Sequence, residues 1–193
     1  MSFLEPRGRQ QMKVLVVYES VYGATQGIAE RIASTLEQQG LQVKVRAARQ
    51  ADPPENYDAV IIGSAEYFFH WMKGATKFIR SYTAVLVKKP VWLFSSGPLG
   101  WEPNDAQGRD LRTLIEPKEI AEFRESIHPR EHRVFFGAMH PGKLGFVHKM
   151  IYKVPDDNGK PMFPSGDFRD WNDIDTWTRE IAQELNVERN IAC

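Results

Sequence analysis

The sequence predicts an α/β fold: a doubly wound, five-stranded parallel sheet of strand order 2-1-3-4-5, with helices on both faces. Short apolar runs alternate with segments of helical periodicity along the 193 residues, and this alternation is typical of parallel sheets joined by right-handed crossovers. Five such runs occur, which suits the 2-1-3-4-5 order. The first run is apolar at consecutive positions, as expected of a strand buried on both faces.

That first strand is predicted over residues 13–18, which read Lys-Val-Leu-Val-Val-Tyr. β-Branched residues dominate it, and they favour the extended backbone. The second strand follows Gly40, which is a plausible end for the first helix. The remaining strands are predicted over 41–45, 57–63, 91–94 and 133–137.

Three segments between the strands carry apolar residues at helical spacing, the pattern of a helix that packs one face on a sheet. Asp170 or Asn172 is the candidate cap of the last helix. The stretch 97–133 is expected to contain a loop and one or two helices, and 155–170 an irregular loop. The residues of the helical faces are Ile28, Ile32 and Leu36; Ala75, Phe78, Ile79, Tyr82 and Leu86; and Ile174, Trp177, Ile181 and Leu185.

Composition bounds the class of protein. The chain is 42% hydrophobic and 26% charged, which are ordinary values for a globular domain. We expect a flexible lead-in over 1–11 and a single domain over 12–193. The formal charge is zero, so nothing favours nucleic acid. Cys193 is the one cysteine, which indicates a reducing, cytoplasmic setting without disulfides.

The loop after the first strand has the features of a phosphate site. It leads directly into a helix, whose first N–H groups and dipole favour an anion. Gly23 lets the backbone approach a ligand closely, and Ser20 and Thr25 offer hydroxyl donors. The candidate phosphate-binding residues are Ser20, Val21, Tyr22, Gly23, Ala24 and Thr25.

Other nucleotide and phosphate sites fit this loop less well. A dinucleotide fold would place Gly-x-Gly-x-x-Gly here, whereas the loop contains only Gly23 and Gly27. A triphosphate-binding loop would need Gly-Lys-Ser/Thr, which is missing. A phospho-receiver domain would need an aspartate at the end of the third strand, where Gly63 and Ser64 stand. A serine-bearing turn that merely caps the helix stays an alternative.

Two further loops at the same sheet edge suit a planar ring. The loop after the third strand contains four aromatic residues in five positions, 67–71, and aromatic rings stack well on a flat heterocycle. We expect Tyr67 or Phe68 to face a ring and Trp71 to enter the core. The loop after the fourth strand is rich in small residues that permit close approach. The candidate ring-binding residues are Ser64, Ala65, Glu66, Tyr67, Phe68, Ser95, Ser96, Gly97, Pro98 and Leu99.

These motifs resemble those of a known family. Ser20-x-Tyr22-Gly23-x-Thr25 is similar to the flavodoxin phosphate loop, in which Tyr22 is a departure. The segments 134–138 and 170–174 resemble those of the bacterial flavodoxin-type, menaquinone-dependent protoporphyrinogen oxidases and their uncharacterised relatives. The resemblance covers roughly 13–187 and implies a flavodoxin-like fold with flavin mononucleotide (FMN) as cofactor.

The resemblance further implies an FMN-dependent oxidoreductase that passes electrons from an organic donor to a quinone-like acceptor. A non-catalytic flavodoxin electron carrier is the alternative. Such carriers are usually steered to their partners by a net charge, and the net charge of this chain is zero. An NAD(P)H:quinone reductase is a third reading. Candidate partners are a quinone or porphyrin-type molecule or a redox protein, and nothing in the sequence sets the oligomeric state.

The remaining candidate functional residues give weaker indications of function. His140 and His148 have no carboxylate at ligand spacing, so no metal site is expected. His70, in the aromatic loop, is a candidate donor to a reduced ring. Residues 143–154 form an amphipathic pattern with three lysines, a candidate for peripheral contact with the inner membrane face. No catalytic side chain can be named.

Overall fold

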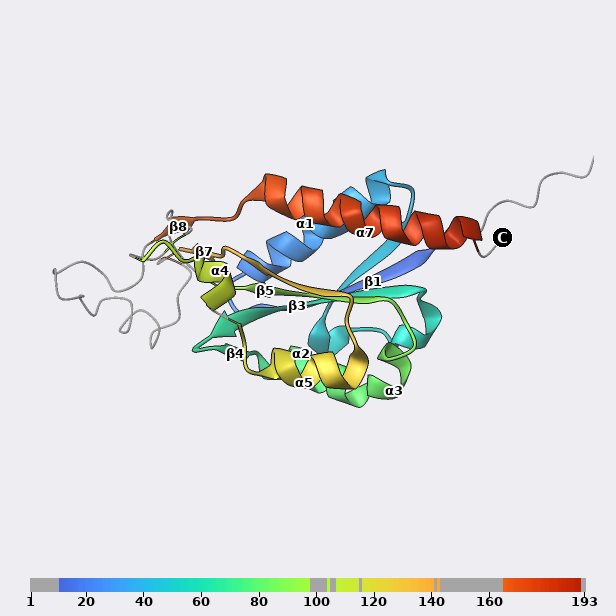
Figure 1. The fold of residues 1–193 in the computed structure, drawn as a ribbon, viewed down its shortest axis with the longest axis horizontal. Coiled ribbons are helices and arrows are strands. Elements are labelled where there is room, and N and C mark those ends of the chain that lie inside the picture. The colour runs from blue at the N-terminus through green and yellow to red at the C-terminus, as the bar shows by residue number, and fades with distance from the viewer. Residues whose placement is uncertain are drawn as a thin grey trace, which may run out of the picture.

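The computed structural model describes residues 11–97, 104, 107–114, 116–140, 142 and 165–191. Figure 1 shows a sheet between two layers of helices. The predicted helix over 143–154, Pro98 and Leu99, and the first part of the expected loop at 155–170 lie outside the described residues.

The central sheet has the predicted topology. Its parallel strands are ordered β2-β1-β3-β5-β6, and β4 is a short antiparallel addition to β3, so the five parallel strands follow the order 2-1-3-4-5. The flavodoxin-like fold is therefore confirmed. The strands span Lys13–Glu19 (β1), Gln42–Ala47 (β2), Ala59–Tyr67 (β3), His70–Trp71 (β4), Val91–Ser96 (β5) and Glu131–Phe135 (β6).

Helices cover both faces of the sheet (Figure 1). Two of them, α1 (Ala24–Gln38) and α7 (Trp171–Ile191), lie side by side on one face. On the other face lie α2 (Lys73–Ser81), α3 (Thr83–Leu86) and α5 (Glu119–Ile127). Short elements complete the description: α4 (Leu111–Leu114), the 3-10 turns Ala48–Gln50 and Pro54–Asn56, and the paired strands β7 (Ala138–Met139) and β8 (Gly166–Asp167).

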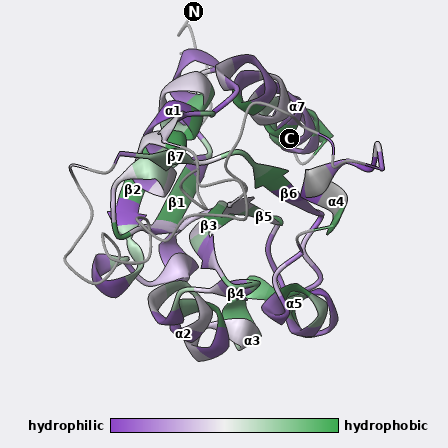
Figure 2. Ribbon diagram, turned by 90° about the vertical axis from the view of Figure 1, so that its left-hand side faces the viewer, coloured by the Kyte–Doolittle hydropathy of each residue, from purple (hydrophilic) through white to green (hydrophobic). Residues whose placement is uncertain are grey.

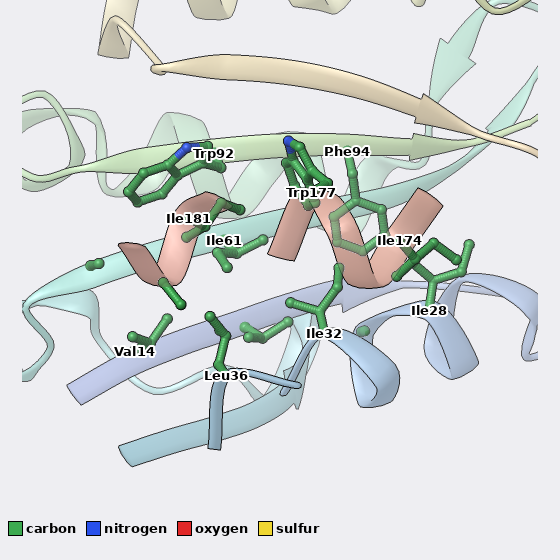
Figure 3. Packing of buried hydrophobic residues seen from close by; sticks show 14 of the residues in the cluster. Val14, Ile28, Ile32, Leu36, Ile61, Trp92, Phe94, Ile174, Trp177 and Ile181 are labelled. Carbon is green, nitrogen blue, oxygen red and sulfur yellow. The ribbon is translucent and has the colours of Figure 1, made fainter. Parts of the chain in front are cut away.

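Two apolar cores result, one on each face of the sheet. Successive residues of β1 alternate between them: Val14 and Val16 face α1 and α7, while Leu15 and Val17 face the opposite helices. Figure 3 shows Trp177 of α7 among the side chains of the first core. Apolar colour runs along the central strands in Figure 2, as expected of strands covered on both sides.

The structure differs from the sequence expectations mainly at the ends of elements. The helix expected over 75–86 is divided at Tyr82, whose φ of −117° leaves the helical region. The Thr83 hydroxyl donates to the carbonyl oxygen of Ile79 at 3.0 Å, which competes with helical hydrogen bonding. The third strand continues past Gly63 to Tyr67 and turns back as β4.

Asp170 is the residue that caps the last helix. Its Oδ1 accepts from the backbone N–H of Asn172 at 2.9 Å and of Asp173 at 3.1 Å. The alternative cap, Asn172, lies inside the helix. Among the described residues, no helix is long and apolar enough to cross a membrane.

Candidate functional site

The predicted loops meet at one edge because neighbouring parallel strands end there together. Ser64 of β3 pairs with Glu19 of β1 on one side and with Ser95 of β5 on the other. The loop after β1, the hairpin after β3 and Gly97 after β5 therefore share the carboxyl edge of the sheet. In doubly wound folds this edge, where the winding direction reverses, is the ligand-binding position.

The β1–α1 loop is shaped by a glycine in the left-handed conformation. Gly23 has φ +89° and forms the N-terminal boundary of α1. Its N–H donates to Ser20 Oγ at 3.0 Å, and its carbonyl accepts the first helical N–H, from Gly27, at 3.0 Å. A Cβ on Gly23 would meet nothing within 4 Å, so backbone conformation selects glycine and space stays open above it.

Thr25 has the features of an anion-binding residue. The residue is fully buried, yet its Oγ1 has no hydrogen-bond partner among the described residues. A buried hydroxyl is nearly always satisfied, so an orphan calls for a ligand. The first turn of α1 carries no acidic residue, and its N–H groups lack partners within the helix. A phosphate group fits this donor set.

Arg169 lies beside the same helix start, which no local sequence signal indicates. Its Nη1 donates to the carbonyl oxygen of Ala24 at 3.3 Å, and its guanidinium covers Gly27. The Arg169 Nε donates to Asp167 at 2.7 Å, and the Arg169 Cζ lies 4.4 Å from the centroid of the Trp171 ring. This arrangement places a guanidinium group, paired with the Asp167 carboxylate, at the outer side of the first turn.

The β3–β4 hairpin carries backbone strain. Phe68 and Phe69 have φ values of 52° and 62°, and the pairs Glu66–Trp71 and Tyr67–His70 flank them. Two successive positive φ angles define a hairpin turn that normally takes Asn-Gly. Side chains other than glycine in this region cost free energy and concentrate at functional sites.

Contacts with α5 and with β3 hold the strained hairpin. Glu119, in the first turn of α5, approaches His70 Nδ1 at 2.8 Å through Oε1 and accepts the Trp71 N–H at 3.1 Å through Oε2. The N–H of Lys118 donates to the Phe69 carbonyl at 3.0 Å. The N–H of Met72 donates to Ser64 Oγ at 2.9 Å. The bonds from Lys118 and Glu119 come from residues far along the chain, which the sequence pattern did not indicate.

The hairpin aromatics divide between solvent and core. Phe68 is 76% exposed and Phe69 is exposed beside it, whereas Trp71 is 4% exposed. The prediction that Trp71 enters the core is confirmed. Tyr67 is half-buried, and this burial raises its pKa to about 12, so its hydroxyl keeps its proton. Val21, in the first loop, is a further exposed apolar residue at this edge.

A buried polar chain runs beneath the hairpin. Trp71 Nε1–H donates to Ser95 Oγ at 2.7 Å, and Ser95 Oγ lies 2.8 Å from His132 Nε2. His132 Nδ1 lies 3.3 Å from Glu116 Oε1, and Arg124 pairs with Glu116. Burial lowers the pKa of His132 to about 4, and this effect outweighs the opposing pull of Glu116. Neutral His132 then accepts from Ser95 and donates to Glu116.

This serine, histidine and glutamate do not form a hydrolytic triad, because Ser95 is fully buried and its hydroxyl already receives the Trp71 N–H. This row of hydrogen-bonded side chains instead holds the Trp71 ring in place. The Ser64 hydroxyl is likewise held inside, since it donates to the Ala65 carbonyl at 2.9 Å.

The remaining predicted ring residues lie close together. Ala65 and Ser96 are buried neighbours on adjacent strands, and Glu66 packs against Gly97. His70, proposed from sequence as a ring donor, has its Nδ1 directed to Glu119. Among the described residues, no group of three or more His, Cys, Asp or Glu side chains could hold a metal ion.

Comparisons with known proteins agree with this fold. The model of the flavodoxin domain family matches residues 15–160. Protoporphyrinogen IX dehydrogenase (quinone) of Escherichia coli K12 is 26% identical over 180 residues, which cover 89% of this chain and 95% of that protein.

Two solved structures show the same fold. A flavodoxin from the domain Archaea has a TM-score of 0.55 at 21% identity, over 91% of this chain and 99% of that one. Rubredoxin oxygen:oxidoreductase of Desulfovibrio gigas has a TM-score of 0.56 at 14% identity, over 93% of this chain and 37% of that one.

Proposed function

The chain belongs to the flavodoxin-domain family and binds FMN, and we propose that it is an oxidoreductase that passes electrons from an organic donor to a quinone-like acceptor. The proposal extends to this chain what the name of the E. coli relative says of that protein, which acts on protoporphyrinogen IX and a quinone. It also places the chain in the cytoplasm, with 143–154 as its contact with the inner membrane face.

The observation that carries the proposal is the strained, exposed Phe68–Phe69 tip at the ligand edge of the sheet. Exposed aromatic side chains beside a binding site suit a flat, apolar reaction partner. An electron carrier that docks on a basic protein would instead be expected to present acidic charge there. The chain has no net charge, and its exposed tip is apolar.

In this proposal the cofactor-binding residues are those that the sequence indicated. The Thr25 hydroxyl, which has no partner among the described residues, and the N–H groups at the start of α1 hold the phosphate, with the Arg169 guanidinium nearby. The flavin ring takes the part of the edge between the β3–β4 hairpin and Gly97. Residues 12–193 act as one domain, with 1–11 as a lead-in.

Bound FMN supplies the two-electron chemistry, and the protein supplies binding, orientation and electrostatics. Gly23 leaves open space for close approach of a ligand, whereas Glu66 fills the space beside Gly97. The Phe68 and Phe69 rings shield the reacting edge from water and contact the apolar partner. Glu119 and the buried chain from Trp71 to His132 keep the hairpin in place during turnover.

The experiment begins with purified protein, which should be yellow and contain one FMN per chain. The protein is then reduced without oxygen and mixed with menadione or with a ferredoxin-type protein, and flavin reoxidation is followed by absorbance. Rapid reoxidation by menadione and slow reoxidation by the protein partner support the proposal. The reverse order would identify an electron carrier instead.

Two variants test the role of the hairpin tip. Phe68→Ala should slow the reoxidation by menadione. Val87→Ala, which changes an exposed apolar residue in another region, should leave that rate unchanged.

A further inference from the structure

Glu66 lies where the hairpin and the end of β5 meet. Its Oε2 packs so closely on Gly97 that a Cβ there would lie 2.6 Å from this oxygen. The same oxygen is buried and has no hydrogen-bond partner in the described part of the chain. The backbone N–H of Phe69 donates to the carboxylate. The carboxyl group thus joins the two segments between which the flavin ring is proposed to lie.

The charges around Glu66 favour its protonated form. Burial raises its pKa to about 7, the Glu119 carboxylate adds to the rise, and the Phe69 N–H opposes it. His70, the histidine of the hairpin, has its Nδ1 directed to Glu119. Tyr67, the adjacent residue, keeps its proton because burial raises its pKa to about 12. Among the described residues, Glu119 is the charged group that acts on Glu66.

We propose that Glu66 binds one proton when the bound FMN is reduced and releases it when the FMN is oxidised again. Two-electron reduction with one proton leaves the ring with added negative charge, and a nearby carboxylate then gains free energy by becoming neutral. The balance is two electrons and two protons, one proton on the ring and one on Glu66. The site is thereby matched to a quinone, which takes up two electrons and two protons to become a quinol.

This inference rests on the proposed ring position, and only its link to quinol formation rests on the proposed function. The test is the midpoint potential of the bound FMN as a function of pH, measured on holoprotein between about pH 5.5 and 9. Each proton taken up with two electrons lowers the potential by about 30 mV for every tenfold fall in proton concentration. Glu66→Gln keeps the size of the side chain and removes the titration.

The wild-type potential should fall more steeply than that of Glu66→Gln, by about 30 mV per pH unit, over a window that begins near pH 7. Glu119→Gln should move the start of this window to lower pH, because it removes the like charge. Glu122→Gln is the matched control: this α5 carboxylate is exposed and paired with Arg80 at 2.7 Å, and its removal should leave the slope unchanged. Parallel wild-type and Glu66→Gln lines would overturn the inference.

Infrared difference spectra of the wild-type protein provide a test that needs no variant. Reduction should produce a band of a protonated carboxyl group, and the band should shift when glutamate carries carbon-13. Its absence at pH 8 would overturn the inference even if Glu66→Gln fails to hold FMN. Failure of menadione to reoxidise the protein, with the steeper slope retained, would overturn the proposed acceptor and leave the role of Glu66 intact.

Discussion

The two ends of the candidate site are built in different ways. The phosphate loop, 20–25, uses glycine for its one left-handed residue and leaves the Thr25 hydroxyl without a partner among the described residues. The β3–β4 hairpin, 66–71, places two phenylalanines in the left-handed region and is anchored by side chains of α5, β3 and β5, while both phenylalanine rings stay exposed. One end is built for an anion with little backbone strain, while the other is strained and is held by hydrogen bonds from distant residues.

The phosphate loop is formed by residues that are close in sequence, whereas the hairpin depends on contacts with residues distant in sequence. The phosphate loop needs only the start of a helix and a glycine, both of which are contiguous in sequence. The hairpin needs Glu119, Ser95 and His132, which lie between 24 and 61 residues away from Trp71, to outweigh its backbone strain. Substitutions in the loop should therefore change ligand affinity, and substitutions under the hairpin should change stability.

The largest effect is expected at Trp71. Trp71→Ala empties a large buried aromatic site and should lower the free energy of unfolding of the apoprotein by about 3–5 kcal/mol. Phe68→Ala, three residues away and exposed, should change it by about 0.5 kcal/mol or less, while altering flavin affinity or potential. Chemical unfolding beside flavin titration measures both. Equal losses of stability would show that the two rings do not divide between core and site.

The next effect is a pH dependence of stability that depends on His132. Its pKa is about 4 in the folded protein and about 6.5 when unfolded, so the unfolded state binds more protons between these values. The contribution of neutral His132 to the free energy of unfolding is present in full above about pH 6.5. It should fall by about 3 kcal/mol as the pH drops to 4.

Glu66 acts in the opposite direction, because its raised pKa makes the folded state bind more protons between pH 4.5 and 7. The His132 effect is therefore measured as the difference between wild type and His132→Gln in urea unfolding at several pH values. The wild type should lose stability relative to the variant as the pH falls. A difference that stays constant with pH would show that His132 is not held neutral by burial.

At the phosphate loop, Thr25→Val should weaken FMN binding about tenfold or more, since a hydrogen bond to a charged group contributes about 1.5–3 kcal/mol. Riboflavin, which lacks the phosphate, should bind nearly as before. Apoprotein stability should be kept or increased, because the lost hydroxyl has no partner among the described residues. Fluorescence titration with both flavins measures the affinities.

Thr35→Val is the matched control on the same helix. Thr35 is also buried, but its hydroxyl donates to Asp175 at 3.0 Å, so this change should cost stability and spare FMN affinity. If Thr25→Val weakened both flavins equally, Thr25 would act through folding and not through the phosphate.

The smallest effect is expected from relief of strain. Phe68→Gly should raise the free energy of unfolding by about 1 kcal/mol, because glycine accepts the positive φ without cost and the lost ring is mostly exposed. The same change should slow reoxidation by menadione. A variant that is destabilised would show that the Phe68 ring packs against the protein in solution.

Much of the fold follows from sequence periodicity because each strand is covered on both faces. Val14, Leu15, Val16 and Val17 are all buried, and only a strand between two helical layers buries consecutive residues. The break at Tyr82 was missed because the apolar spacing continues through it. The hairpin after β3 was missed because Phe-Phe is not a turn sequence, and its conformation depends on distant partners.

The sequence by itself determined where the strands and the phosphate loop lie along the chain, because both show as patterns within a few residues. The alternation of strands with helices then predicted the strand order. It also placed the aromatic residues at the ligand edge. Only the tertiary structure decided which groups hold the Trp71 ring, that Arg169 lies beside α1, and that Glu66 is buried against Gly97. These outcomes depend on which distant groups desolvate or bond each side chain, and no local pattern encodes that.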